Sequence, residues 1–186
     1  MSLRLFIFIF LLAVISGCIA GEKKEDTTEV NTMGDISISA EAFKAGETIP
    51  AEYTCDGKDL SPALSWKGIP ANTKSLALIM DDPDAPGRTF LHWVIFNIPA
   101  NTEKLQKGVP RKETLSDGSR QGMTDFGRVG YGGPCPPPGK PHRYFFRLYA
   151  LDTVLNLPAG ASRKQLEDAM KGHTLAKGEL MGKYGR

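Results

Sequence analysis

Four prolines stand within positions 134–138, and this run limits the structures that the surrounding chain can form. Proline fixes the backbone dihedral φ and has no N–H group, so it breaks helices and is excluded from the interior of sheets. Cys135 is therefore the only residue of the run with a backbone donor. We interpret the segment either as a rigid loop at the edge of a sheet or as a rigid loop that presents one amide to a ligand.

The apolar residues outside the amino terminus are grouped in short runs bounded by turn-forming residues. Ile36 and Ile38 alternate with serines, and the segments 75–80, 91–98 and 144–151 are apolar runs of strand length. The run 144–151 is nearly continuous, which suits a strand covered on both faces. This pattern predicts a fold dominated by strands.

Helix signals are confined to the end of the chain. Ser162 with Gln165 three residues later has the pattern of a capping box, and Gly172 supplies a stop signal. Between them, Leu166, Ala169 and Met170 form an apolar stripe. We expect a second short helix from His173 to about Met181. Strands followed by helices favour a mainly β fold with a few short helices, including C-terminal helices, over an alternating α/β fold.

The amino terminus has the pattern of a lipoprotein signal. Arg4 precedes an apolar run from 5 to 15 that is too short for an ordinary membrane span, and Ile15-Ser-Gly-Cys18 resembles a lipobox. We expect a signal peptide over 1–17, a lipidated Cys18 with a flexible tether over 18–33, and a folded domain over 34–186. Such a protein would be extracytoplasmic and anchored to the cell membrane. A plain signal peptide and an uncleaved anchor are the alternatives.

Size, charge and cysteine content narrow the function. About 150 residues remain for the folded part, which is enough for one domain. The formal net charge of +2 falls to +1 without Arg4, so no electrostatic argument favours nucleic acid as a partner. If Cys18 is lipidated, Cys55 and Cys135 remain as a pair. A disulfide between them suits an oxidising compartment, but sequence alone does not show that they meet.

Acidic and histidine side chains stand beside the proline-rich segments. The stretch Asp81-Asp-Pro-Asp-Ala-Pro86 directly follows the run 75–80, so the sheet would carry carboxylates at its edge, held by prolines. His92 opens the next apolar run, and His142 precedes the run 144–151. Either histidine alone is more often structural, but the repeated arrangement favours a binding site.

The motifs of the chain together resemble the phosphatidylethanolamine-binding protein family, in its prokaryotic YbhB/YbcL-like branch, which is described as Raf-kinase-inhibitor-like. They are Asp82-Pro-Asp-Ala-Pro86, His92-Trp-Val-Ile-Phe-Asn97, Gly133-Pro-Cys-Pro-Pro137, His142-Arg-Tyr144, Thr54-Cys-Asp-Gly57 and Ser61-Pro-Ala-Leu-Ser-Trp66. The resemblance covers essentially all of 36–186. Only the lipobox and the tether lie outside it.

The resemblance implies a β-sandwich-like core with a small pocket for phosphate, phosphoryl headgroups or acetate-like ions. It implies no enzymatic activity, no cofactor and no metal. The implied ligand-binding residues are Asp82, Asp84, Pro86, His92, the amide of Cys135, Pro136, His142 and Tyr144. Whether Asp84 faces the pocket or only shapes its turn stays open. Tyr184 is a weak candidate for a further lining tyrosine.

The carboxylate in an anion pocket has two interpretations. Asp82 could accept a hydrogen bond from one ring nitrogen of a histidine, so that the other nitrogen donates to a ligand. It could also accept the proton of a monoanionic phosphate. Both versions predict a nearly charge-balanced pocket that selects small, singly charged groups and binds them weakly.

Three other functions are compatible with some of these residues. Two histidines and two aspartates are suitable zinc ligands, but the sequence has no His-x-x-x-His or Cys-x-x-Cys spacing. A hydrolase with Cys135 as nucleophile and His142 as base is conceivable, although a Gly-x-Ser-x-Gly elbow is absent from the sequence. The main alternative is an inhibitor of a protease or kinase that acts through contact with an unknown protein partner. We expect a binding protein, with a possible regulatory role.

Overall fold

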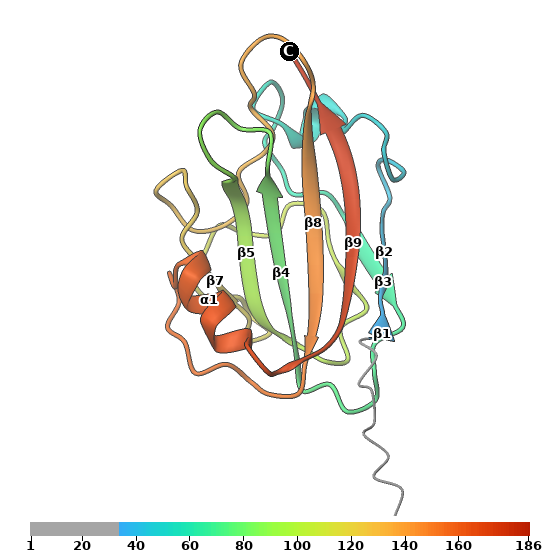
Figure 1. Ribbon diagram of the computed structural model, residues 1–186, viewed down its shortest axis with the longest axis vertical. Helices are drawn as coiled ribbons and strands as arrows, with labels where there is room; N and C mark the ends of the chain where they lie inside the picture. Colours follow the sequence, from blue (N-terminus) through green and yellow to red (C-terminus); the bar gives the residue numbers. More distant parts are fainter. Residues whose placement is uncertain (1–33) are drawn as a thin grey trace, which may run out of the picture. The chain divides into compact units, whose positions relative to one another are not determined.

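The computed structural model describes residues 34–186 (Figure 1). The expected signal peptide, Cys18 and the whole of the tether lie outside the described residues. The strands are β1 (Gly34–Asp35), β2 (Ser37–Ala40), β3 (Leu64–Lys67), β4 (Ser75–Asp82), β5 (Phe90–Pro99), β6 (Lys104–Leu105), β7 (Arg120–Gln121), β8 (His142–Leu151) and β9 (Thr174–Tyr184). The helices are a 3-10 turn, η1 (Ala51–Tyr53), and α1 (Arg163–Met170). No helix among these residues is long and apolar enough to cross a membrane.

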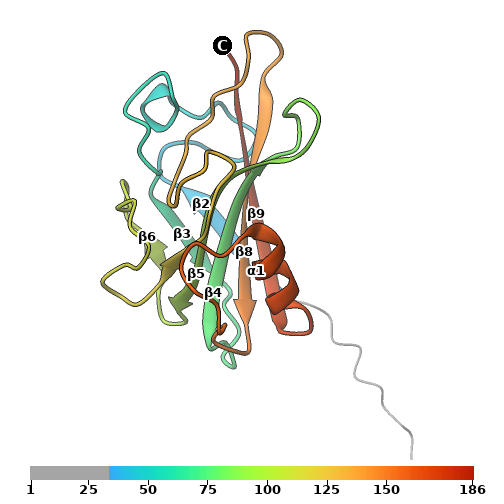
Figure 2. The same ribbon diagram turned by 90° about the vertical axis from the view of Figure 1, so that its left-hand side faces the viewer.

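The strands form two sheets, which confirms the predicted mainly β sandwich-like fold. The larger sheet has the order β1-β9-β8-β4-β5-β7, and the smaller has the order β2-β3-β6. Figure 2 shows α1 on one side of the larger sheet and the strands β3 and β6 on the other. The core therefore has two layers, one between the sheets and one beneath α1.

Strand β4 lies at the centre of both layers, and every one of its residues is buried. Because successive side chains point to opposite faces, Leu76 and Leu78 join the layer between the sheets, while Ala77 and Ile79 pack beneath α1. The sequence predicted that the run 144–151 would be covered on both faces. In β8, however, alternate side chains remain partly exposed, so β4 is the fully covered strand instead.

The helix α1 begins and ends where the sequence predicted. Ser162 caps it through a capping box in which both reciprocal hydrogen bonds with Gln165 are present. Gly172 follows in the left-handed conformation, with φ of 77°. Leu166 and Met170 of the apolar stripe are buried against the sheet.

The prediction of a second helix from His173 to about Met181 is wrong, because this segment forms most of β9. The strand pairs with β8 along nearly its whole length, in an antiparallel register that sets Tyr184 opposite His142. Its inward positions include two glycines that neighbouring segments approach closely. A Cβ atom at Gly178 would lie 2.1 Å from the carbonyl oxygen of Ile36, so the strand accommodates this crossing only with glycine there.

The long segment between β5 and β8 has few regular elements, as its glycine and proline content predicted. It runs beside the edge of β5 and is held there by backbone hydrogen bonds. Asp125 N donates to Leu91 O at 3.0 Å, and Gly132 N donates to His92 O at 3.0 Å. These bonds bring the proline-rich segment to the end of the sheet where β5 begins.

Candidate functional site

A small cavity of about 200 Å³ lies at the end of the larger sheet where β4 ends and where β5 and β8 begin. In Figure 1 this is the end at which β4 points upward and the carboxyl terminus lies. The lining residues are Asp82, Ala85, Pro86, Phe90, His92, Phe126, Cys135, Pro136, Pro137, His142 and Tyr144. Of the predicted ligand-binding residues, the structure brings all except Asp84 to this cavity.

Asp82 and His142 form a buried pair in the wall of the cavity. Asp82 is the last residue of β4, His142 is the first residue of β8, and His142 Nδ1 lies 2.7 Å from Asp82 Oδ2. Because a carboxylate oxygen accepts, Nδ1 of His142 donates its proton in this bond. The other carboxylate oxygen, Oδ1, accepts from the backbone N–H of Asp84 at 2.8 Å. Both oxygens of Asp82 are thus used in fixing the wall.

His92 is held in one defined orientation on β5. Its Nδ1 lies 2.8 Å from the carbonyl oxygen of Gly132, and a carbonyl can only accept, so Nδ1 carries a proton. Burial lowers the pKa of His92, against opposing contributions from the Gly132 carbonyl and Asp82. The ring is therefore neutral near pH 7, and its Nε2 has a free lone pair.

Tyr144 contributes a hydroxyl group that is buried in the cavity wall. Its ring meets that of His92 edge to face, with centroids 5.2 Å apart. Within the described part of the chain, the Tyr144 hydroxyl makes no hydrogen bond of good geometry, although the Asp82 carboxylate lies close to it. Burial, reinforced by the Asp82 carboxylate, raises the pKa of Tyr144 far above its usual range, so the group stays a neutral O–H. A buried hydroxyl without a partner costs free energy, which a bound acceptor would recover.

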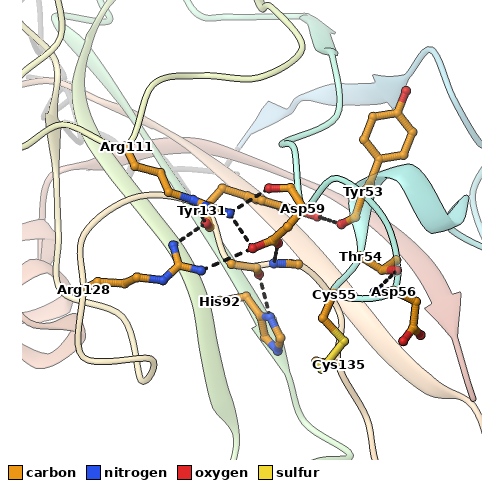
Figure 3. Close-up of polar contacts among 12 residues, drawn as sticks. Tyr53, Thr54, Cys55, Asp56, Asp59, His92, Arg111, Arg128, Tyr131 and Cys135 are labelled. Atoms are coloured by element: carbon orange, nitrogen blue, oxygen red, sulfur yellow. Dashed lines mark hydrogen bonds and ion pairs between the residues drawn. A yellow bond between two sulfur atoms is a disulfide. The ribbon is translucent and has the colours of Figure 1, made fainter.

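The proline-rich segment 134–138 forms a rim of the cavity. A disulfide between Cys55 and Cys135 joins this rim to a distant loop (Figure 3). Beside the sulfur atoms, Cys55 N donates to Pro134 O at 3.1 Å. In residues 34–186, the backbone N–H of Cys135 has no acceptor. The structure therefore contains the disulfide that the sequence left open, together with a free amide at Cys135.

Asp59 organises the segment that precedes the rim, a role that the sequence analysis missed. Figure 3 shows its carboxylate between the guanidinium groups of Arg111 and Arg128. It also accepts the N–H of Gly133 at 2.6 Å. Both arginines donate to the carbonyl of Tyr131, at 2.8 and 2.9 Å. This network fixes the backbone around Gly132, whose carbonyl orients His92.

Asp84 was predicted as a ligand-binding residue, but it does not line the cavity. Its carboxylate binds Arg143 through both oxygens, at 2.8 and 2.7 Å, and also accepts the Arg143 N–H at 2.9 Å. The Arg143 side chain lowers the pKa of Asp84 to about 2. Asp84 thus shapes the turn after β4. Tyr184 also lies outside the lining, because its hydroxyl donates to Asp56 at 2.6 Å.

Four lining residues were not predicted: Ala85, Phe90, Phe126 and Pro137. The two phenylalanines form an aromatic wall, with ring centroids 4.9 Å apart and both rings within 5.3 Å of His92. Phe90 could have been found as the residue that opens β5. Phe126 carries no signal in the sequence, because it stands in an irregular loop.

The same fold occurs in a known family. The family model described as "Phosphatidylethanolamine-binding protein" matches residues 39–185. The chain belongs to the phosphatidylethanolamine-binding protein family. Within this family, it is 54% identical over 151 residues to a UPF0098 protein of Methanothermobacter thermautotrophicus, covering 81% of this chain and 99% of that relative.

Solved structures of this family have the same architecture. A phosphatidylethanolamine-binding protein homologue of Chlamydia trachomatis is 38% identical, with a TM-score of 0.75, and the match covers 82% of this chain and 98% of that one. Escherichia coli YbcL is 34% identical, with a TM-score of 0.76 and coverage of 82% and 99%. The predicted resemblance to the family and to its YbcL-like members is therefore confirmed.

Proposed function

We propose that this member of the phosphatidylethanolamine-binding protein family is a non-enzymatic binding protein whose cavity takes a small anion, such as phosphate or a phosphoryl headgroup. The observation that carries the proposal is the pair of free donors on one cavity. Tyr144 and Cys135 both line it, and neither the buried Tyr144 hydroxyl nor the Cys135 N–H makes a hydrogen bond to an acceptor in the described chain. An anion oxygen placed between them would satisfy both groups.

The chemistry of the wall supports binding rather than catalysis. The Cys135 sulfur is part of a disulfide and therefore provides no thiolate for nucleophilic attack. The cavity holds only a few ligand atoms, and each contributes at most about 1.5 kcal/mol to binding. We therefore expect weak binding of small groups, with dissociation constants in the micromolar to millimolar range.

The protein is further proposed to be extracytoplasmic and anchored through lipidated Cys18. The disulfide supports an oxidising compartment. The chain enters the domain at Gly34, which pairs with Ala176 near the start of β9, whereas the cavity lies beside the other end of β9, where Tyr184 pairs with His142. Eight residues of strand separate these positions, or about 26 Å. The point where the chain enters the domain and the cavity thus lie at opposite ends of β9.

The anchor is tested by replacing the cysteine of the lipobox. Wild-type protein should be found in the membrane fraction, and its mature form should carry the mass of attached acyl chains. Cys18→Ala should abolish both. Membrane association of Cys18→Ala equal to that of the wild type would contradict the lipoprotein proposal.

The anion site is tested by following the histidine NMR signals of the protein while phosphate or phosphoethanolamine is added. His92 and His142 should shift, whereas His173 serves as an internal control, because it pairs with Asp152 at 2.8 Å on the surface. Tyr144→Phe keeps the ring and removes only the hydroxyl, so it should weaken binding about 5- to 10-fold. Signals of His92 and His142 that stay unchanged at millimolar ligand would refute the proposed function.

A further inference from the structure

We propose that the cavity recognises the hydrogen-bearing monoanion of an oxyacid, typified by a phosphomonoester with one protonated oxygen, and that Nε2 of His92 accepts this hydrogen. The inference rests on the proposed anion-binding function and names the ligand class. It distinguishes a phosphomonoester from a sulfate monoester or a phosphodiester, which are monoanions without an acidic hydrogen.

The first step is the fixed tautomer of His92. Its Nδ1 proton is committed to Gly132 O at 2.8 Å, and the backbone of that carbonyl is held by the Asp59 network. The neutral ring therefore presents Nε2 as an acceptor. Three aromatic rings surround it: those of Phe90, Phe126 and Tyr144 have centroids 5.1 to 5.3 Å from its own. These surroundings disfavour a charged imidazolium, in agreement with the lowered pKa of His92.

The second step is the charge of the lining. It contains the carboxylate of Asp82 and no lysine or arginine. The nearest guanidinium on the same strand as His142 is that of Arg143, which is engaged by Asp84 outside the cavity. The ammonium group of Lys140 belongs to an adjoining hollow that shares Pro137 and His142 with the cavity, so a dianion would meet a carboxylate with no fixed cation in the lining itself. A monoanion keeps its interactions with the two free donors at a much smaller electrostatic cost.

The third step is the match of donors and acceptors. The Cys135 amide and the Tyr144 hydroxyl serve unprotonated oxygens of the ligand, whereas Nε2 of His92 requires a hydrogen on the ligand. Both oxygens of Asp82 already accept hydrogen bonds, from His142 and from the Asp84 amide. Each oxygen of Asp82 therefore has only one further lone pair to offer, whereas Nε2 of His92 accepts no hydrogen bond in the described chain. Only a ligand with both P–O⁻ and P–OH groups satisfies all of these partners.

Few other groups can produce a pH dependence around His92. From β4 it faces Asp82, and from β8 it faces His142 and Tyr144. The loop packed against it supplies Phe126, beneath the Arg128 guanidinium, and the rim supplies Cys135, which does not titrate in a disulfide. A phosphomonoester loses its second proton near pH 6, so its monoanion falls from about nine tenths at pH 5 to about one hundredth at pH 8.

The test compares methyl phosphate with methyl sulfate, which has the same shape but no acidic hydrogen, by calorimetry between pH 5 and pH 8. Methyl phosphate affinity should fall about 90-fold over this range, and at pH 5 it should exceed that of methyl sulfate at least tenfold. At pH 7.5, in buffers of different ionisation enthalpy, binding of methyl phosphate should take up about one proton. Dimethyl phosphate controls for the weaker acceptor oxygens of sulfate and should also bind weakly at every pH.

The outcomes separate the two proposals. If neither phosphate compound binds at any pH, the anion site itself is refuted. If methyl sulfate gains affinity at low pH as strongly as methyl phosphate, the protein rather than the ligand carries the proton, and the ligand-class inference is overturned while the anion site stands. His92→Phe preserves the aromatic packing and should reduce the preference for methyl phosphate over methyl sulfate to about one. The proton-uptake measurement on the wild type decides the question even if this variant fails to fold.

Discussion

Removal of the Cys55–Cys135 disulfide is expected to destabilise the protein mainly by freeing its unfolded chain. The bond joins residues 80 positions apart. Loop closure of that length removes about 15 cal/mol/K of entropy from the unfolded state, or about 4.5 kcal/mol at ~25 °C. This is a large fraction of the free energy of unfolding of a typical domain, which is roughly 5–15 kcal/mol.

The folded state should change much less, because other contacts join the same two segments. Cys55 N donates to Pro134 O at 3.1 Å, and the Tyr131 hydroxyl donates to Tyr53 O at 2.7 Å. Asp59 also accepts the N–H of Gly133, which directly precedes the rim. We therefore expect the rim to keep its place without the sulfur bond, and ligand affinity to fall no more than about threefold, which corresponds to less than 1 kcal/mol.

The assay is urea unfolding of the wild type and of the double variant Cys55→Ser, Cys135→Ser, followed by tryptophan fluorescence. The free energy of unfolding of the variant should be lower by about 3 to 4.5 kcal/mol. Its m-value should be larger, because its unfolded chain is more expanded. A loss below about 1 kcal/mol would refute the loop-entropy argument. Loss of ligand binding by a folded variant would show instead that the disulfide itself positions the rim.

Three further predictions concern single side chains. Gly133→Ala would place a Cβ atom 2.4 Å from a backbone oxygen of the neighbouring loop, so it should destabilise the protein by on the order of 2 kcal/mol in urea unfolding. Asp81→Asn removes the buried carboxylate that binds two arginines, one of them on α1, and should cost about 3 kcal/mol in the same assay. The pKa of His92, measured by NMR, should lie below the ordinary histidine value of about 6.5. The contribution of this residue to stability should be complete above that value and decrease as the pH falls toward the folded pKa, because the unfolded chain takes up the proton first.

The sequence predicted the long strands well, because their apolar runs are bounded by turn residues. It failed at β9, whose leucine, alanine, lysine and glutamate residues favour a helix in isolation. Alternation of buried and exposed positions was present from Ala176 to Tyr184, but two glycines occupy inward positions and conceal it. Pairing with β8 decides the structure of this segment, which is a tertiary effect that local propensity does not contain.

The site was predictable where its residues border strands and not where they lie in loops. Asp82, His92 and His142 are each at or near the end of a strand, so the order of the apolar runs placed them together. Phe126 and Asp59 reach the site through irregular segments. Their positions depend on individual hydrogen bonds, such as that of Asp125 N to Leu91 O, which have no periodic trace in the sequence.

The free amide of Cys135 explains why the rim contains so many prolines. Cys135 itself is exposed, so water satisfies its N–H before a ligand binds, but in a flexible loop this group would also turn towards competing backbone acceptors. Here the three fixed φ angles on its C-terminal side and the proline before it prevent such relaxation. Hydrogen bonds also hold the neighbouring backbone groups: Gly133 N donates to Asp59, Cys55 N donates to Pro134 O, and Arg186 Nε donates to Pro136 O. Prolines remove the competing donors, and these contacts hold the remaining one in the cavity wall, so the ordering cost of presenting it is met during folding rather than during binding.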